Sequence, residues 1–154
     1  MADVVHFKVI DEDPRRLLPE VNGADLDTLV LAFELAHGFD PAGGYGGLVP
    51  AYFNYGNLAT YLVGQNPNQW PGQNRLWLLA CECGEVGCWP LEARVTLTPT
   101  LAIWDQFAQP HRRERDYTAF GPWMFDRIQY ETSVASAVDA LDRVDVQTPS
   151  GGHD

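Results

Sequence analysis

Three cysteines within eight residues are the side chains of this sequence best suited to chemistry. The stretch CECGEVGC holds them at Cys81, Cys83 and Cys88, and the chain has no other cysteine. Thiolates are favoured ligands of Zn²⁺, which takes four ligands in a tetrahedral structural site. His111 follows the next predicted strand, so it is the candidate for the fourth ligand. One hypothesis is therefore a zinc site formed by Cys81, Cys83, Cys88 and His111.

Two other interpretations of the cysteines stay open. Cys83 and Cys88 could meet across a hairpin and form a disulfide, although the anionic neighbours Glu82 and Glu85 would raise the pKa of a nearby thiol. The third interpretation is structural, because a free cysteine packs as a small apolar side chain. The spacing C-x-C-x4-C differs from the paired C-x2-C pattern of many zinc domains, so spacing alone does not decide between the three.

An arginine-rich segment, QPHRRERDY, follows at residues 109–117 of a chain that is otherwise poor in positive charge. Guanidinium groups bind carboxylates and phosphates through paired hydrogen bonds. This segment is therefore a candidate site for a small anion or an acidic peptide. The candidate ligand-binding residues are His111, Arg112, Arg113, Arg115 and Tyr117. The alternative is that the arginines pair within the chain, with Asp105, Glu114, Asp116 or acidic residues of the last helix.

Three antiparallel strands are predicted to position the cysteines. RLWLLACEC (75–83) and CWPLEARVTL (88–97) flank GEVG (84–87), which indicates a four-residue hairpin turn, and LAIWDQF (101–107) completes a meander. Side chains alternate between the two faces of a strand. This register places all three thiols on one face together with Leu79. The opposite, apolar face is predicted to hold Leu76, Leu78, Ala80, Trp89, Leu91, Ala93 and Val95.

Two main helices are predicted around these strands. The first runs through ADLDTLVLAFELAH, with Asp25 as its N-cap and Gly38 as its stop. The second follows Asp126 as its N-cap, with Gln129 as the capping-box partner. Phe125 and Tyr130 are placed to form a hydrophobic staple across that cap. The buried stripe of the second helix is predicted to be Ile128, Val134, Val138 and Leu141.

The remaining segments complete an α+β prediction. Residues 4–10 alternate as a strand does, residues 39–57 are expected to form an ordered surface loop, and Asn57 is expected to cap a short helix. The predicted fold is an antiparallel β-meander sheet with two main helices packed on one face. It forms a single globular domain over residues 1–146, followed by a flexible tail at 147–154.

Charge and composition restrict the functional classes. The chain has 21 acidic and 10 basic residues, a net charge of −11 and a pI near 4.6, so it repels nucleic acid phosphates. No apolar run approaches the length of a membrane span, and the N-terminal sequence has no secretory-signal pattern. With an odd number of cysteines, these features predict a cytoplasmic protein with reduced thiols.

The sequence carries none of the short motifs that mark common enzyme classes. G-x-S-x-G, H-E-x-x-H and G-x-G-x-x-G are absent. The glycine-rich GGYGG is followed by Leu48 and Val49, where a phosphate-binding P-loop needs lysine and a hydroxyl residue. Whether the protein is an enzyme therefore stays open at the level of sequence.

Four blocks of the sequence resemble a family of small uncharacterised bacterial proteins, encoded largely in high-GC genomes. These blocks are VNGADLDTLV, GGYGGLVP, LLACECGEVGCWPLEARV and WDQFAQPHRRERDYTAFGPWMFDRIQYE. They cover most of the chain, and the cysteine block and the QPHR block are distinctive. The resemblance implies a bacterial cytosolic setting and a single domain, and it implies no activity.

Two functional hypotheses follow. The first is a small acidic binding protein, an immunity-like or regulatory partner of a basic protein, because a charge of −11 attracts cationic surfaces. The second is a small metal-dependent protein or enzyme that uses the cysteine cluster and His111 with the neighbouring arginines. Stoichiometric zinc in the purified protein would favour the second hypothesis, and recovery of one basic partner would favour the first.

Overall fold

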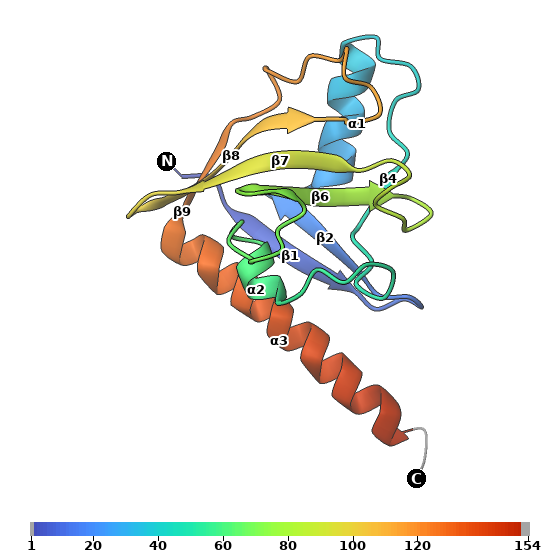
Figure 1. Cartoon of the computed structure of the whole chain (residues 1–154), viewed down its shortest axis with the longest axis vertical. Coiled ribbons are helices and arrows are strands. Elements are labelled where there is room, and N and C mark those ends of the chain that lie inside the picture. Colours follow the sequence, from blue (N-terminus) through green and yellow to red (C-terminus); the bar gives the residue numbers. More distant parts are fainter. Residues whose placement is uncertain (1, 152–154) are drawn as a thin grey trace.

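The computed structural model describes the backbone of residues 2–151 and the side chains of residues 2–142 (Figure 1). Two antiparallel sheets and three helices are present in this part of the chain, which confirms the predicted α+β class. In chain order the elements are β1 (Val5–Ile10), β2 (Arg16–Val21), β3 (Ala24–Asp25), α1 (Leu26–Ala36), β4 (Tyr45–Gly46), α2 (Leu58–Tyr61), β5 (Pro71–Gly72), β6 (Arg75–Cys81), β7 (Leu91–Leu97), β8 (Leu101–Ala108), β9 (Trp123–Asp126) and α3 (Arg127–Gly151).

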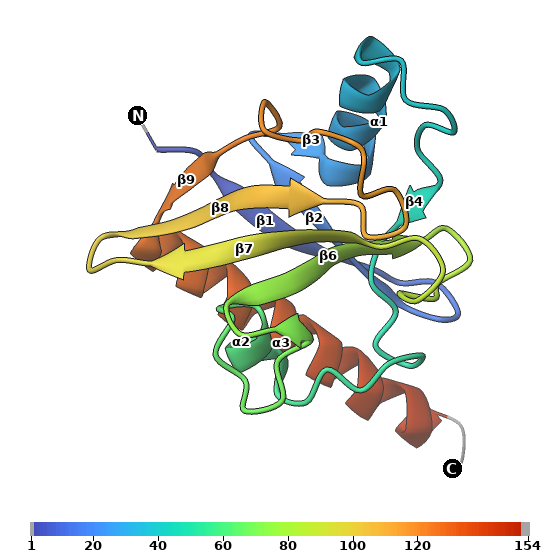
Figure 2. The same ribbon diagram turned by 45° about the horizontal axis from the view of Figure 1, so that its top comes forward.

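The larger sheet contains the predicted meander. Its strands follow the order β4-β6-β7-β8-β9, with β5 paired to the free part of β6, and every pairing is antiparallel. Figure 2 shows the long strands β6, β7 and β8 side by side, with β9 leading directly into α3. The short strands β4 and β5 are additions that the sequence did not indicate, because two residues are too few to show a period.

A second sheet of three strands joins β1, β2 and β3. The predicted strand at residues 4–10 is confirmed as β1, which pairs with β2 from Val5 opposite Val21 to Ile10 opposite Arg16. The strand β2 was not predicted, because RLLPEV contains a proline and does not alternate between polar and apolar residues. Asn22 and Gly23, both with positive φ, form the tight turn that leads into β3.

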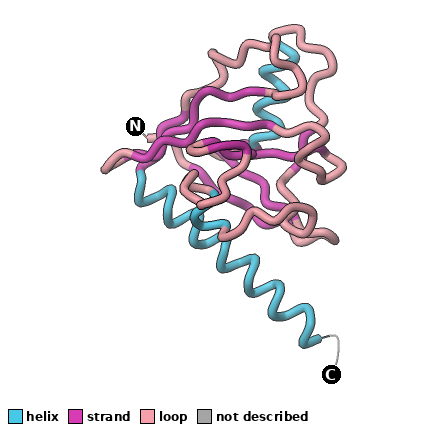
Figure 3. Tube along the Cα trace, in the orientation of Figure 1, coloured by secondary structure: helices cyan, strands magenta, loops and turns pink. Residues whose placement is uncertain are grey.

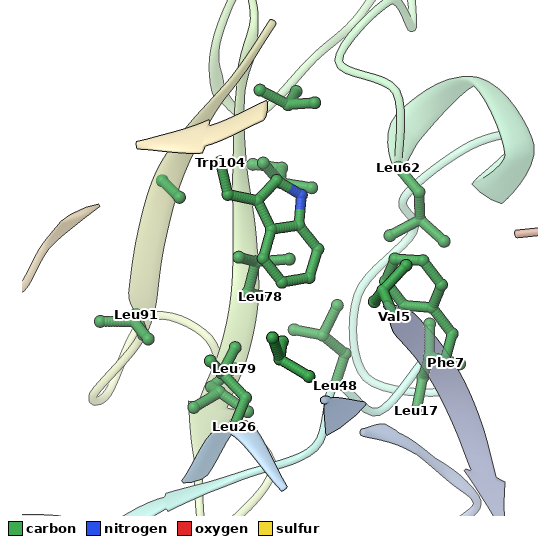
Figure 4. Close-up of a cluster of buried hydrophobic side chains, with 14 of the residues drawn as sticks. Val5, Phe7, Leu17, Leu26, Leu48, Leu62, Leu78, Leu79, Leu91 and Trp104 are labelled. Atoms are coloured by element: carbon green, nitrogen blue, oxygen red, sulfur yellow. The ribbon is translucent and has the colours of Figure 1, made fainter. Parts of the chain in front are cut away.

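The core lies where β1, the larger sheet and α3 meet. Figure 4 shows Trp104 and Leu78 of the larger sheet facing Val5 and Phe7 of β1. Edge-to-face ring contacts join Trp104 to Phe7, with 6.0 Å between ring centroids, and Phe7 to Tyr130 of α3, with 5.6 Å. Buried aromatic pairs of this kind stabilise a core beyond the area that they bury. The two sheets and the last helix are thus parts of one hydrophobic core.

Helix α3 begins as predicted, and three of the four residues of its predicted stripe face the core: Val134 and Leu141 are buried, and Val138 is partly buried. Asp126 Oδ2 accepts a hydrogen bond from the Gln129 backbone N–H at 3.1 Å, and the rings of Phe125 and Tyr130 lie 5.7 Å apart across the cap. Ile128 is 75% exposed, so its assignment to the buried stripe was wrong. Tyr130 points into the core. Ile128 comes two residues earlier in the helix, so its side chain points to the opposite side. Among the side chains of α3 up to residue 142, the buried ones are Tyr130, Ser133, Val134, Ala137 and Leu141.

Gln129 binds β1 and not the helix cap. Its side-chain amide accepts a hydrogen bond from Val5 N at 3.1 Å and donates one to Val5 O at 2.6 Å. Ser133 Oγ accepts a further bond from Phe7 N at 3.2 Å. The capping-box role predicted for Gln129 was therefore wrong. These side chains instead satisfy the outer edge of β1, which would otherwise offer unpaired backbone groups to another strand.

Helix α1 has the predicted boundaries, but the side chain of its N-cap residue does not cap it. Asp25 precedes the helix but makes no side-chain cap, because its carboxylate accepts a hydrogen bond from Lys8 Nζ at 2.5 Å. Gly38 follows the last turn with φ of 69°, as expected for a glycine stop. Asn57 caps α2 as predicted, with its Oδ1 accepting from Thr60 N at 3.3 Å.

The glycine-rich segment at residues 39–57 enters the core, so its prediction as a surface loop was wrong in part. Leu48 and Val49 are buried, and Leu48 exchanges backbone hydrogen bonds of 2.7 and 2.9 Å with Leu17 of β2. Tyr45 pairs with Cys81 at the end of β6. The segment thus connects the two sheets. Its sequence has no regular alternation of polar and apolar residues, so this role was not predicted.

The helix α3 continues past the two sheets in Figures 1 and 3 and ends at Gly151. The predicted tail at 147–154 therefore begins inside this helix, and residues 152–154 lie outside the described residues. Among the helices of residues 2–151, none is long and apolar enough to cross a membrane.

Candidate metal centre

The cysteines lie on the connection between β6 and β7, which is longer than predicted. β6 ends at Cys81 and β7 begins at Leu91, so nine residues connect the strands in place of the expected four. Trp77 pairs with Glu92, two positions from the predicted register, and a bulge before Leu79 interrupts the alternation of faces. Leu79, which was predicted on the face of the thiols, is fully buried.

The predicted clustering of the thiols is nevertheless confirmed. The Sγ atoms of Cys81, Cys83 and Cys88 all lie within 4.8 Å of one another, and all three are free thiols. Backbone turns inside the connection bring them together: Gly84 N donates to Cys81 O at 2.7 Å, and Cys88 N donates to Glu85 O at 3.3 Å. A curled turn thus achieves the clustering that the sequence attributed to one face of a hairpin.

Gly84 is necessary for this turn. Its φ of 99° lies in a region that other residues rarely adopt, and an added Cβ would lie 2.6 Å from the ring of Tyr52. Tyr52 therefore packs directly over the backbone of the turn. A side chain at position 84 would have to displace this ring as well as strain the backbone.

Backbone hydrogen bonds point at two of the sulfurs. Cys83 N donates to Cys81 Sγ at 3.4 Å, and a hydrogen bond from the backbone of Glu85 lowers the pKa of Cys83. The Glu85 carboxylate opposes this shift, as the sequence suggested, but the backbone hydrogen bond is the larger effect. Burial raises the pKa of Cys81 to about 11. Cys83 is therefore the readier of these two thiols to become a thiolate.

The sulfur positions are close to those of a metal–thiolate site. A Zn–S bond length of about 2.3 Å places the sulfurs of a tetrahedral site about 3.8 Å apart. The three sulfurs lie within 4.8 Å of one another, which is at most about 1 Å more than that spacing. Cys83 and Cys88 are exposed and Cys81 is half-buried, so an ion can approach from solvent.

His111 lies beside the turn but outside the group of clustered ligand atoms. Its Nε2 lies 2.8 Å from Gly87 O, one residue before Cys88, while the group within 4.8 Å contains only the three thiols. The imidazole stacks on Trp89, with 6.4 Å between centroids and 10° between planes. Direct ligation by His111 would require its ring to move closer to the thiols.

The arginine-rich segment is split between the interior and the surface. Tyr117 OH donates to Glu34 Oε2 at 2.5 Å, and Arg115 Nη1 lies 3.3 Å from the same oxygen. Tyr45 OH donates to it at 2.7 Å. Arg115 and Tyr117, predicted to bind a ligand, thus belong to a buried network centred on Glu34, which is fully buried.

Sequence reasoning overlooked Glu34 as a polar core residue. Glu34 follows Val30 by four positions and therefore lies on the buried stripe of α1. A carboxylate at a core position of an amphipathic helix signals a buried partner. That signal was available in the sequence, whereas the identity of the partner, Arg115, depends on the tertiary fold.

Within the described side chains, Arg112 and Arg113 form none of the internal ion pairs that the sequence offered as an alternative. Asp105 pairs with Arg94 at 2.8 Å, and Asp116 accepts hydrogen bonds from Thr118. Among the residues whose side chains are described, no carboxylate forms a salt bridge with Arg112 or Arg113. These two guanidinium groups stay available for an external anion.

The fold and the site together define an α+β protein with three thiols gathered on one exposed turn. Comparison with known proteins finds no significant match to a family model, a curated protein or a solved structure. The resemblance to a bacterial family therefore stays a prediction.

Proposed function

We propose that this protein binds a thiophilic metal ion, Zn²⁺ foremost, through Cys81, Cys83 and Cys88. One observation carries the proposal: three free thiols lie within 4.8 Å of one another on a single turn. A core that needs only small apolar side chains has no reason to expose Cys83 and Cys88 to solvent. The packing interpretation therefore accounts for the cysteines less well than metal binding does.

The backbone of the turn supports the thiolate state that a metal requires. Metal ligation displaces the thiol protons, and the N–H groups that point at Cys81 and Cys83 stabilise the resulting negative charge. Ligand orientation by such hydrogen bonds is a general feature of metal sites. In this proposal the turn supplies three ligands together with the backbone N–H groups that stabilise two of them.

The fourth coordination position distinguishes two forms of the site. With His111 as a ligand the site would be closed, as in structural zinc sites. With water in that position the site would keep an open place for a substrate, as in catalytic zinc sites. The hydrogen bond from His111 to Gly87 places the ring next to the turn in either case.

Metal titration tests the proposal. We expect the reduced protein to bind one equivalent of Zn²⁺ in competition with a chromophoric chelator, and Co²⁺ to give a thiolate charge-transfer band. Cys83→Ser should weaken binding by more than about 100-fold, because loss of a ligand exceeds the 10- to 100-fold effect of losing an outer-shell partner. Glu82→Gln, an exposed neighbour on the same turn, is the matched control and should bind normally.

Two results would contradict the proposal. One is a wild-type protein that takes up no Zn²⁺ under reducing conditions. The other is a Cys83→Ser variant that binds as tightly as wild type, because the ion would then be held elsewhere. His111→Ala separates the two forms of the site, since only the closed form loses affinity.

A further inference from the structure

A small hollow lies beside the end of β8, apart from the thiol turn. Its cavity volume is about 290 Å³, at the small end of the range for ligand sites. Its lining combines small residues such as Ala108 and Pro110 with a cluster of charged residues. The lining residues are Pro71, Glu92, Ala108, Gln109, Pro110, Arg112, Arg113 and Arg115.

The charges around this hollow leave an excess of two positive charges. Glu92 is neutralised by Arg75, whose Nε lies 2.7 Å from the carboxylate. Arg115 is balanced by the buried Glu34. Arg112 and Arg113 have no carboxylate partner among the described side chains. In a chain with 21 acidic residues, these two arginines give the hollow a locally positive potential that attracts anions.

Two of the arginines are already held in place. Arg112 lies over the Trp89 ring, 5.1 Å from its centroid, and donates to His111 O at 3.0 Å. Arg115 Nη2 donates to Pro41 O at 2.6 Å. Arg115 Nη1 is buried and has no hydrogen-bond partner, because its approach to Glu34 at 3.3 Å lacks hydrogen-bond geometry. A buried donor of this kind is costly unless an acceptor reaches it.

We propose that the hollow binds a small dianionic oxyanion, a phosphate ion or the phosphoryl group of a small metabolite. A phosphoryl group carries a charge of about −1.5 to −2 at neutral pH, which matches the excess of two positive charges, whereas a carboxylate balances only one. Guanidinium groups match the oxygens of such an anion geometrically. This site does not depend on the proposed metal centre.

Titration of the full-length protein with inorganic phosphate at constant ionic strength, followed by two-dimensional ¹H–¹⁵N NMR, tests this inference. We expect saturable shifts of the amide signals from His111 to Arg113. Arg112→Gln and Arg113→Gln should each weaken binding at least about tenfold, because each removes charge-assisted hydrogen bonds. Arg127→Gln is the matched control, since Arg127 pairs with Glu131 on the surface of α3.

Three comparisons decide the outcome. Acetate should bind at least about tenfold more weakly than phosphate, because it supplies a single charge; equal binding would overturn the assignment to a dianion. Cys83→Ser should bind phosphate as wild type does, and loss of binding there would assign the anion to a metal and overturn the site. Shifts that do not saturate, or that persist unchanged in both arginine variants, would also overturn it.

Discussion

At the scale of single residues, Glu34 organises the polar interior. Its Oε1 accepts a hydrogen bond from Gly43 N at 2.7 Å, and its Oε2 accepts from the hydroxyls of Tyr45 and Tyr117. The charge is balanced by Arg115, whose side chain is only 4% exposed. A buried ion pair is not stabilising by default, but removing one partner leaves the other charge without compensation.

We therefore expect Glu34→Gln to be strongly destabilising. The variant keeps the shape of the side chain and leaves Arg115 charged in the interior, which costs about 3–5 kcal/mol of the free energy of unfolding. Urea denaturation followed by circular dichroism measures this loss. Glu131→Gln is the control, because its pair with Arg127 is largely exposed and should change stability by less than about 1 kcal/mol. Similar losses in both variants would contradict the role assigned to Glu34.

At the scale of elements, sequence patterns predicted those helices and strands whose formation depends on residues close together in the chain. The meander, α1, and the cap and staple of α3 were predicted from periodicity and from capping residues such as Asp126. The bulge before Leu79 was not predicted, because a single extra residue leaves no mark on the sequence pattern. The core role of Leu48 depends on a partner in β2 that is distant in the chain. The thiol cluster was predicted because the three cysteines are neighbours in sequence, whereas Glu34 and Arg115 meet only in the fold.

The junction of α3 with β1 yields a prediction at this scale. Gln129→Ala removes both hydrogen bonds to Val5 and leaves its backbone groups unpaired, which should cost about 2 kcal/mol or more of unfolding free energy. Asp126→Ala removes only the cap and should cost about 1 kcal/mol. Ile128→Ala, at an exposed position, should stay within about 0.5 kcal/mol of wild type. Chemical denaturation of the three variants measures this order, and a larger effect for Asp126 than for Gln129 would contradict it.

At the scale of the whole molecule, the net charge favours cationic binding partners, and the buried tyrosines make stability depend on pH. The predicted role as partner of a basic protein rests on the charge of −11 and stays a prediction; affinity capture with the tagged protein tests it. Burial raises the pKa of most tyrosines of the chain, to about 12 for Tyr117. The others with a raised pKa are Tyr45, Tyr55, Tyr61 and Tyr130.

These tyrosines predict cooperative alkaline unfolding. Their pKa is raised in the folded state, so their contribution to stability is complete below pH 10 and declines as the pH rises further. Each buried tyrosine then costs about 1.4 kcal/mol per pH unit, because the unfolded state releases a proton that the folded state keeps. We expect the phenolate absorbance of these five tyrosines to rise in one step together with the loss of circular dichroism. Gradual ionisation of all five in a protein that stays folded would contradict the prediction.

Trp89 lies next to both proposed sites, so its fluorescence can report on binding at each of them. The indole follows Cys88 in sequence, stacks on His111, lies under the Arg112 guanidinium and donates to Gly43 O at 2.9 Å. Indole emission is sensitive to neighbouring charge and to ring contacts, so this one chromophore is a built-in optical sensor for both ligands. Cys83→Ser should therefore abolish the emission change caused by Zn²⁺ and keep the emission change caused by phosphate, because the two sites bind their ions independently.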